Sequence, residues 1–275
     1  MPASTIRRFS ARRFCLHALA QVHGKPAYAV NQPDTDELND VARITGYPGV
    51  YRKSHVHCLN QKECAIRCAT ELGKTYEEGT FIVAHVGGGL SVACHDHGRM
   101  VDTNDVLEGS GPFAPNRSGD VPLKPVVKLA FSGEHTKKEI DGVIGKTGGL
   151  VGLVGTDDAR QIDARIEAGD EWAKICYEAM AYQVAKAIGA FATVLKGKVD
   201  GIVLTGGVSH DPFFVNYVTE RVSWIAPIKV YAGDFEMDAL AAGAVRALNG
   251  EEKVMTYTGE PSWKGFQMEG AIPEA

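Results

Sequence analysis

Apolar and polar residues alternate with two different periods along this chain, and the strand-like pattern is clearest before its midpoint. Residues 81–86 form an almost continuous apolar run that leads into three glycines. Residues 90–95 and 99–102 have the composition of two further strands, and Gly98 stands between them as a turn residue. Short strands joined by glycine-containing turns predict an antiparallel meander.

Helical spacing dominates the region after this meander. The longest pattern covers residues 171–195, where Trp172, Ile175 and Ala179 begin a series of apolar side chains about one helical turn apart. Shorter helices are expected at residues 14–22, 60–72, 122–131, 136–143 and 157–168.

The last third of the chain alternates strands with helices. Residues 200–205 have the pattern of a buried parallel strand that enters a glycine pair. A helix at residues 212–222, a strand at 228–231 and an alanine-rich helix at 237–248 follow, and a separate short strand is expected at 27–30. This order predicts an α/β domain whose mixed sheet is flanked by helices.

Two glycine bends are the first candidates for chemistry. His85 is followed by glycines at 87–89, and the bare backbone of such a bend can cradle a phosphate, although a simple tight hairpin explains the same residues. Gly206 and Gly207 follow a buried strand, where open α/β sheets bind nucleotides or where close packing requires small residues. If the bends grip one nucleotide, they must converge in space.

Three charged or ionisable side chains could act on a phosphoryl group. Arg117 lies in a Gly-, Pro- and Asn-rich loop, where it is either a solvated surface residue or a clamp that binds phosphate through two bonds. His57 shares a face with His55 if the segment is extended, and it could donate a hydrogen bond, although most isolated histidines do no chemistry. Glu236 either stabilises a helix start or orders Mg²⁺ through water.

Other patterns carry less information. Residues 145–147 look like the end of a P-loop, but the Walker pattern requires glycine where this chain has Ile140. His95 and His97 flank a turn, and both are expected to face solvent. The six cysteines lack the spacing of a disulfide framework or a zinc site, so reduced thiols of a cytoplasmic protein explain them.

Composition excludes several classes of function. The chain is 44% hydrophobic and 23% charged with a net charge of −5, which is typical of a globular protein. It has no basic stripe for nucleic acid beyond its first fifteen residues, and no apolar run approaches the ~20 residues that span a bilayer. The Arg-rich start is consistent with a transit peptide or with a misplaced translation start.

Taken together, these motifs resemble those of the acetokinase family, in its butyrate kinase branch, within the superfamily of acetate and sugar kinases, heat-shock chaperones and actin. The resemblance covers roughly residues 15–250 and depends on the order and spacing of several segments. They are HCLNQKECAIRCA, FIVAHVGGGLSVACHDHGRMVDTND, EGSGPFAPNRSGDVP, GLVGTDDAR, YEAMAYQVAKAIGAFATVLKGKVDGIVLTGGV and ERVSWIAPIKVY.

The resemblance implies a fold of two ribonuclease H-like domains with the ligands between them. Residues 36–234 would form the C-terminal, nucleotide-binding domain, and residues 1–35 would be the remnant of a similar N-terminal domain. Residues 235–250 would form a helix returning to that domain, and 251–275 a tail.

The resemblance also implies an activity and its residues. The expected reaction is the reversible, in-line transfer of phosphate from ATP to a short-chain carboxylate such as butyrate, with Mg²⁺, in a homodimer or larger assembly. Arg117 and His57 would be catalytic, and Glu236 would hold the metal. The implied nucleotide-binding residues are His85, Gly87, Gly88, Gly89, Ser91, Asp158, Arg160, Gly206 and Gly207.

The chain departs from the family pattern at its start. The family's first phosphate motif is missing, and Asn31 stands where a catalytic aspartate is expected, with Asp34 and Asp36 nearby. An N-terminally truncated enzyme is therefore expected. Two alternatives stay open, namely an inactive remnant that at most binds nucleotide, and another kinase or ATPase of the same superfamily acting on a different substrate such as a sugar.

Overall fold

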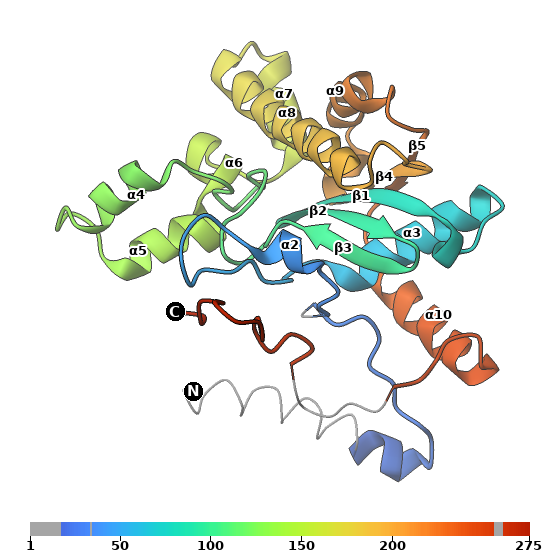
Figure 1. Cartoon of the computed structure of the whole chain (residues 1–275). Coiled ribbons are helices and arrows are strands. Elements are labelled where there is room, and N and C mark those ends of the chain that lie inside the picture. Colours follow the sequence, from blue (N-terminus) through green and yellow to red (C-terminus); the bar gives the residue numbers. More distant parts are fainter. Residues whose placement is uncertain (1–17, 34, 256–260) are drawn as a thin grey trace.

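The computed structural model describes residues 18–33, 35–255 and 261–275, and its centre is one five-stranded sheet (Figure 1). The strand order is β3-β2-β1-β4-β5. The strands are β1 (Thr80–Val86), β2 (Leu90–Asp96), β3 (Arg99–Thr103), β4 (Gly201–Gly206) and β5 (Ile228–Ala232). The first three strands pair antiparallel as a meander, whereas β1–β4 and β4–β5 pair in parallel. The predicted mixed sheet is therefore confirmed.

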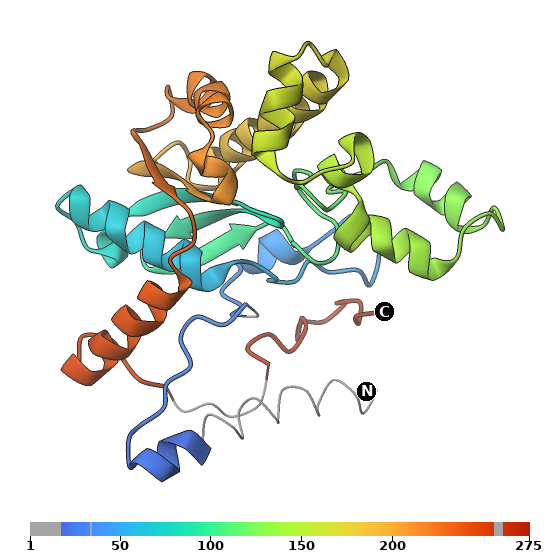
Figure 2. The same cartoon turned by 180° about the vertical axis from the view of Figure 1, so that it is seen from behind.

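Helices cover both faces of this sheet (Figures 1 and 2). The long helix α8 packs with α7 and α9 on one face, while α3 packs on the other and contacts α10. The helices are α2 (Asp40–Arg43), α3 (Cys58–Glu71), α4 (Leu123–Ala130), α5 (Lys137–Gly142), α6 (Gly149–Val154), α7 (Ala159–Glu167), α8 (Glu171–Val194), α9 (Pro212–Val222) and α10 (Glu236–Asn249).

The alternation of side chains along β1 decides what each face contains. Ile82 and Ala84 enter the core beneath α8, whereas Phe81 and Val83 pack beneath α3. Because successive side chains of a strand point to opposite faces, His85 falls on the α3 face. A polar side chain at the end of an apolar strand is thereby directed at the helix that must satisfy it.

Some local expectations were wrong. Residues 27–30 are not a strand but an irregular segment, in which Val30 packs against Gly243 of α10. Their β-branched and aromatic composition suits a strand, but a strand forms only when a neighbouring strand supplies hydrogen bonds. The short helices α2 and α6 were not predicted.

Part of the chain is not described. The predicted helix at 14–22 falls partly outside the described residues, although 18–23 are helical. The Arg-rich start and Asp34 lie outside them entirely. Among the residues that are described, no helix is both long and apolar enough to cross a membrane.

Candidate functional site

The two glycine bends lie side by side at one edge of the sheet. His85 and Thr205 are directly paired residues of the parallel strands β1 and β4, so the bend that follows each strand leaves from the carboxyl edge. Gly206 has a φ of 89°, and a Cβ added there would lie 2.4 Å from the carbonyl oxygen of Val86. Only glycine permits this backbone and this contact. The predicted convergence of the bends is observed.

The glycines of the first bend serve a different purpose. None of residues 87–89 has the left-handed φ that favours glycine, and the turn closes by a 2.9 Å bond from Gly87 N to Gly89 O. Instead, a Cβ on Gly89 would lie 2.1 Å from Nη1 of Arg117, and one on Gly88 would lie 3.1 Å from Nδ2 of Asn116. The bare backbone therefore makes room for two polar side chains from another loop.

Arg117 is held in place by its own loop. Ala114 N donates to Arg117 O at 3.0 Å, Val151 N of α6 donates to Pro115 O at 2.8 Å, and the Arg117 Nε donates to Gly145 O at 3.3 Å. Its Nη1 is buried and has no hydrogen-bond partner among the described residues. Burial lowers the pKa of Arg117, but a guanidinium stays charged in proteins.

An unpaired buried donor is unfavourable by about 1–3 kcal/mol, and more when the group is charged. An anionic oxygen placed against Gly89 and Arg117 would remove this penalty. The orphaned, charged Nη1 thus fits a phosphoryl group.

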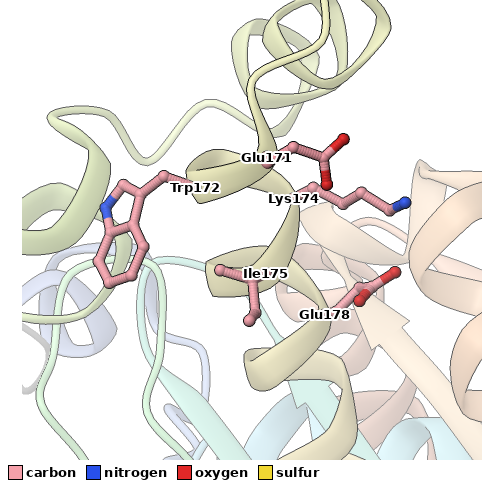
Figure 3. A pocket seen from close by; sticks show the side chains of 5 residues that line it. All are labelled: Glu171, Trp172, Lys174, Ile175 and Glu178. Carbon is pink, nitrogen blue, oxygen red and sulfur yellow. The ribbon is translucent and has the colours of Figure 1, made fainter.

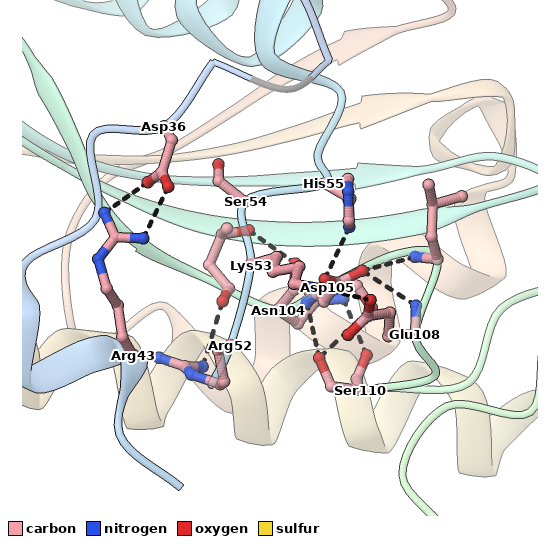
Figure 4. Close-up of polar contacts among 12 residues, drawn as sticks. Asp36, Arg43, Arg52, Lys53, Ser54, His55, Asn104, Asp105, Glu108 and Ser110 are labelled. Atoms are coloured by element: carbon pink, nitrogen blue, oxygen red, sulfur yellow. Dashed lines mark hydrogen bonds and ion pairs between the residues drawn. The ribbon is translucent and has the colours of Figure 1, made fainter. Parts of the chain in front are cut away.

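A second set of contacts fixes the start of this loop to β2 (Figure 4). Asn104 donates to the carbonyl oxygens of Leu90 and Ser110, each at 3.0 Å. Asp105 accepts from two backbone N–H groups with Oδ1 and faces His55 Nδ1 at 2.9 Å with Oδ2, and this contact raises the pKa of His55. Ligand atoms of His55, Asp105 and Glu108 lie within 4.8 Å of one another, but those of Asp105 already have protein donors. The cluster therefore acts as an anchor.

His57 and His85 stack on each other beside the bends, with ring centroids 3.9 Å apart. Burial is the main reason why the pKa of His57 falls to about 3, and the nearby His85 and Arg117 lower it further. Burial alone lowers the pKa of His85 to about 4. Both imidazoles are therefore neutral at pH 7.

Two adjacent amides of α3, which sequence reasoning missed, hold these rings. Asn60 Nδ2 lies 2.8 Å from His85 Nδ1, and Gln61 Nε2 lies 2.9 Å from Ser91 Oγ, which is 2.8 Å from His57 Nδ1. Both amides are completely buried. Two consecutive amides in the first turn of a helix, three and four residues after a histidine, were the signal that could have found them.

The prediction that His95 faces solvent was wrong. His95 is completely buried; its Nε2 lies 3.2 Å from Gln61 Oε1, and its Nδ1 lies 2.8 Å from the Tyr76 hydroxyl. The turn at Gly98 suggested exposure, but the pleat of β2 turns this side chain towards α3, as it does Ser91. His97, at the turn itself, is exposed as predicted.

Comparison with known proteins identifies the family of the chain. The profile of the acetokinase family matches residues 43–252. The chain belongs to the acetokinase family. Two proteins of Clostridium botulinum named "Probable butyrate kinase" are similar to it, one of strain Alaska E43 / Type E3 with 47% identity over 232 residues and one of strain Eklund 17B / Type B with 47% over 233. Each match covers 84% of this chain and 65% of the relative, so the chain spans about two thirds of their length.

Solved structures of acetokinases share the fold. The acetate kinase of Porphyromonas gingivalis matches with a TM-score of 0.70 at 23% identity, covering 77% of this chain and 61% of that one. A propionate kinase of Francisella tularensis matches with a TM-score of 0.66 at 20% identity, covering 74% and 60%.

The other sequence-predicted residues of this chain lie in the second bend and in α7. Gly207 is exposed and begins the short turn that leads into α9. Asp158 caps α7 and binds Arg160 through two bonds of 2.9 and 2.7 Å, and the Arg160 side chain is 90% exposed. This pairing lowers the pKa of Asp158 to about 2. Both residues belong to α7, not to the bends.

The carboxylate nearest to the stacked rings is not the predicted one. Glu236 is exposed in the first turn of α10, whereas Asp234 Oδ1 lies 3.5 Å from His85 Nε2. Phe235, between them, donates its backbone N–H to Asn60 Oδ1 at 3.0 Å, which fixes this connection between β5 and α10.

A surface hollow lies away from the bends. It has a volume of about 410 Å³ and lies beside the first turns of α8, where Trp172 and Ile175 contribute its apolar part and Glu171, Lys174 and Glu178 its polar part (Figure 3). Five residues of one helix make a shallow surface depression, so we assign the chemistry to the bends. A much smaller cavity of about 10 Å³ borders Arg117, Leu90 and Val106.

Proposed function

We propose that this chain transfers a phosphoryl group reversibly between ATP and a short-chain carboxylate, with butyrate as the first acid to test. The observation that carries the proposal is the buried, unpaired Nη1 of Arg117, held against the bare backbone of Gly89. The names of the two Clostridium botulinum relatives support a carboxylate as the acceptor.

Phosphoryl transfer needs little covalent help from a protein, because the carboxylate oxygen can attack the γ-phosphorus in line once both groups are positioned. Arg117 would balance the charge on the equatorial oxygens of the group in flight. His57, which is neutral, would donate a hydrogen bond to the same group. The backbone N–H groups of Gly88 and Gly89 would hold the phosphate chain, since the Gly87 N–H already donates to Gly89 O.

The second bend would receive the sugar and base of the nucleotide. Gly206 brings the chain against Val86, and Gly207, where an added Cβ would meet nothing within 4 Å, leaves the backbone open next to the start of α9, whose N-terminus is capped by Asp211. Asp163 of α7 lies close to Asp211, since its pKa rises to about 6, mainly through burial and then through the Asp211 charge. Helix α7 thus lies near this bend, and we propose that Asp158, at its start, contributes with Arg160 to the nucleotide side.

Mg²⁺ would neutralise charge between the phosphate groups. Glu236 is the residue we propose to hold it, through the water shell that this ion retains. Its carboxylate is exposed and belongs to the helix that begins two residues after Asp234, the neighbour of His85. The chemistry of a single exposed carboxylate fits an ion that keeps most of its waters.

An inactive, nucleotide-binding remnant is the second candidate. It is favoured by one sequence observation, because no segment like the family's first phosphate motif occurs in the 275 residues. The two candidates share the bends and differ only in turnover.

A coupled assay separates them. Purified chain is incubated with ATP, Mg²⁺ and butyrate, the acyl phosphate is trapped with hydroxylamine, and ADP is followed in parallel. Turnover that requires butyrate and is lost in Arg117→Gln supports the kinase. ATP binding by calorimetry without turnover supports the remnant, and the absence of both overturns the assignment. Acetate, isobutyrate and glucose serve as competing acceptors, and a preference for glucose would indicate a sugar kinase.

A further inference from the structure

We infer that the adjacent buried amides Asn60 and Gln61 are positioning residues that lock His85 and His57 in the same tautomer, with the proton on Nε2. The inference rests on the proposed function only for the role that these tautomers would have in the reaction. The tautomers themselves follow from the hydrogen bonds of the described residues, in which one main-chain donor and one main-chain acceptor fix the orientations of the two amides.

The first chain of bonds starts at a backbone donor. Phe235 N can only donate, so the atom that faces it at 3.0 Å must be the acceptor Oδ1 of Asn60. The amide nitrogen Nδ2 therefore faces His85 Nδ1 at 2.8 Å and Thr205 Oγ1 at 3.2 Å. An amide N–H requires a lone pair on Nδ1, and a neutral ring with a lone pair on Nδ1 carries its hydrogen on Nε2.

The second chain starts at a backbone acceptor. Ser91 O can only accept, so the atom that faces it at 3.0 Å must be Nε2 of Gln61. The same nitrogen donates to Ser91 Oγ at 2.9 Å. The Ser91 hydroxyl has no other acceptor among the described residues, so its own hydrogen serves the contact of 2.8 Å with His57 Nδ1. That nitrogen is again an acceptor, and the ring proton again belongs on Nε2.

The far end of the second chain agrees with this direction. Gln61 Oε1 accepts, so His95 Nε2, at 3.2 Å, carries a hydrogen. His95 Nδ1 is then the acceptor for the Tyr76 hydroxyl at 2.8 Å. The bonds run in one direction from Tyr76 to His57 through buried groups, where hydrogen bonds are strong and reversal would leave two acceptors facing each other at Gln61.

The tautomer decides whether the ring edge that faces the bends presents a hydrogen-bond donor or a lone pair to a ligand. A Cβ on Gly87 would lie 3.2 Å from His85 Nε2, so this nitrogen faces the first glycine bend. With the hydrogen on Nε2, each histidine keeps one donor and no lone pair for an anionic oxygen. The other tautomer would direct a lone pair at the phosphate.

The test measures the tautomers directly in the ligand-free full chain. Histidine is labelled with ¹⁵N, and long-range nitrogen–proton correlation spectra at pH 7 report which ring nitrogen is protonated. The variants His57→Gln and His85→Gln assign the signals. We expect neutral rings with protonated Nε2 for both residues. A ring protonated on Nδ1, or on both nitrogens, would overturn the inference.

Two variants test the cause. In Gln61→Glu the side chain can no longer donate, so Ser91 donates to the carboxylate and accepts from His57; we expect the His57 tautomer to change while His85 keeps its own. In Asn60→Asp we expect the His85 tautomer to change while His57 keeps its own. Each variant should lower kcat by about 10- to 100-fold, which is the usual effect of removing a residue that orients a metal-binding histidine. The change in the KM for ATP should be smaller. An unchanged tautomer, or equal changes in both rings, would refute the assignment.

Two controls complete the design. Asn249→Asp makes the same chemical change at an exposed position on α10, and it should alter neither tautomer nor kcat. Gln61→Met keeps the volume if the buried glutamate prevents folding, and it should leave His57 as a mixture of tautomers. Because the spectra need no turnover, an inactive chain with both rings protonated on Nε2 would refute the proposed function alone, and an active chain with the other tautomer would refute this inference alone.

Discussion

His57 and His85 lie face to face, with ring centroids 3.9 Å apart and ring planes inclined by 19°. One ring comes from the residue before α3 and the other from the end of β1. Two imidazolium ions at this distance would repel each other, and neither could be hydrated. The stack therefore excludes a doubly charged pair, so it responds to acid as well as forming part of the site.

Acid should begin to destabilise the fold at pH values well above the folded-state pKa values of these rings. The folded pKa values of His57, His85 and His95 are about 3, 4 and 3, against 6.5 for a free histidine. Between pH 6.5 and 4 the unfolded chain binds protons that the folded chain does not, so the free energy of unfolding falls as pH falls. Each ring contributes up to about 1.4 kcal/mol per pH unit.

Denaturant titrations at pH 7, 6 and 5 would measure this slope. His95→Gln should reduce it, whereas His210→Gln, at an exposed position, should not. Asp163 acts in the opposite direction, because its pKa is raised to about 6 and the folded chain gains its proton first. His55, whose pKa is raised by its contact with Asp105, acts in the same direction as Asp163. These two partly exposed groups do not offset three buried rings, so stability that is constant down to pH 5 would contradict the burial argument.

Gly89→Ala should impair activity without unfolding the chain. The new Cβ would lie 2.1 Å from Nη1 of Arg117, and that atom is the far end of a flexible side chain, so the arginine moves and the backbone stays. A displacement of this size can lower kcat by about 10²-fold. Gly189→Ala in α8, where the Cβ meets nothing within 4 Å, is the matched control. Equal activity of both variants would show that the position of Arg117 is unimportant.

Gly206→Ala should act on the fold instead. The residue has a φ of 89°, and its new Cβ would meet the backbone carbonyl of Val86 at 2.4 Å, where no side chain can give way. We expect a loss of roughly 2–5 kcal/mol in the free energy of unfolding. Thermal and urea unfolding would measure it. A variant as stable as the parent would mean that the two bends are not packed as described.

Arg117→Lys should be nearly as harmful to catalysis as Arg117→Gln. A lysine keeps the charge, but it lacks the planar fork that can donate to Gly145 and to a phosphoryl oxygen together. We expect kcat to fall by about 10²- to 10³-fold. Steady-state kinetics on folded protein, verified by circular dichroism, would decide. Full activity of the lysine variant would leave only a point-charge role for this residue.

The exposed apolar face of helix α10 should make the chain prone to aggregation and to dye binding. Met237 and Leu248 are 77% and 65% exposed, and Leu240 and Val245 share their face at helical spacing. A contiguous apolar face of this kind binds dyes or partners. Met237→Lys combined with Leu248→Lys should lower dye fluorescence and light scattering, whereas Val41→Lys, at a separate exposed position, should not. A monodisperse parent that binds no dye would contradict this expectation.

Much of the fold could be predicted because its signals are local. The apolar run of β1, the turn at Gly98 and the spacing in α8 each lie within a few residues, and all three elements formed. The strand expected at 27–30 failed because strand formation depends on a partner that the sequence does not specify. The prediction that His95 faces solvent was wrong for a related reason, because the elements that pack on a sheet decide which of its faces is buried.

The candidate site, too, was only partly predictable from the sequence. The sequence by itself determined which residue types are available, namely two bare glycine bends, a loop arginine and a histidine before a helix. Only the tertiary structure decided that Asn60 and Gln61 reach these histidines, that Gly89 exists to admit Arg117, and that Asp234 comes closer to His85 than any acid predicted from the sequence. The physical reason is that hydrogen bonds and excluded volume act between residues far apart in the chain, and their partners are fixed only when the sheet and helices pack.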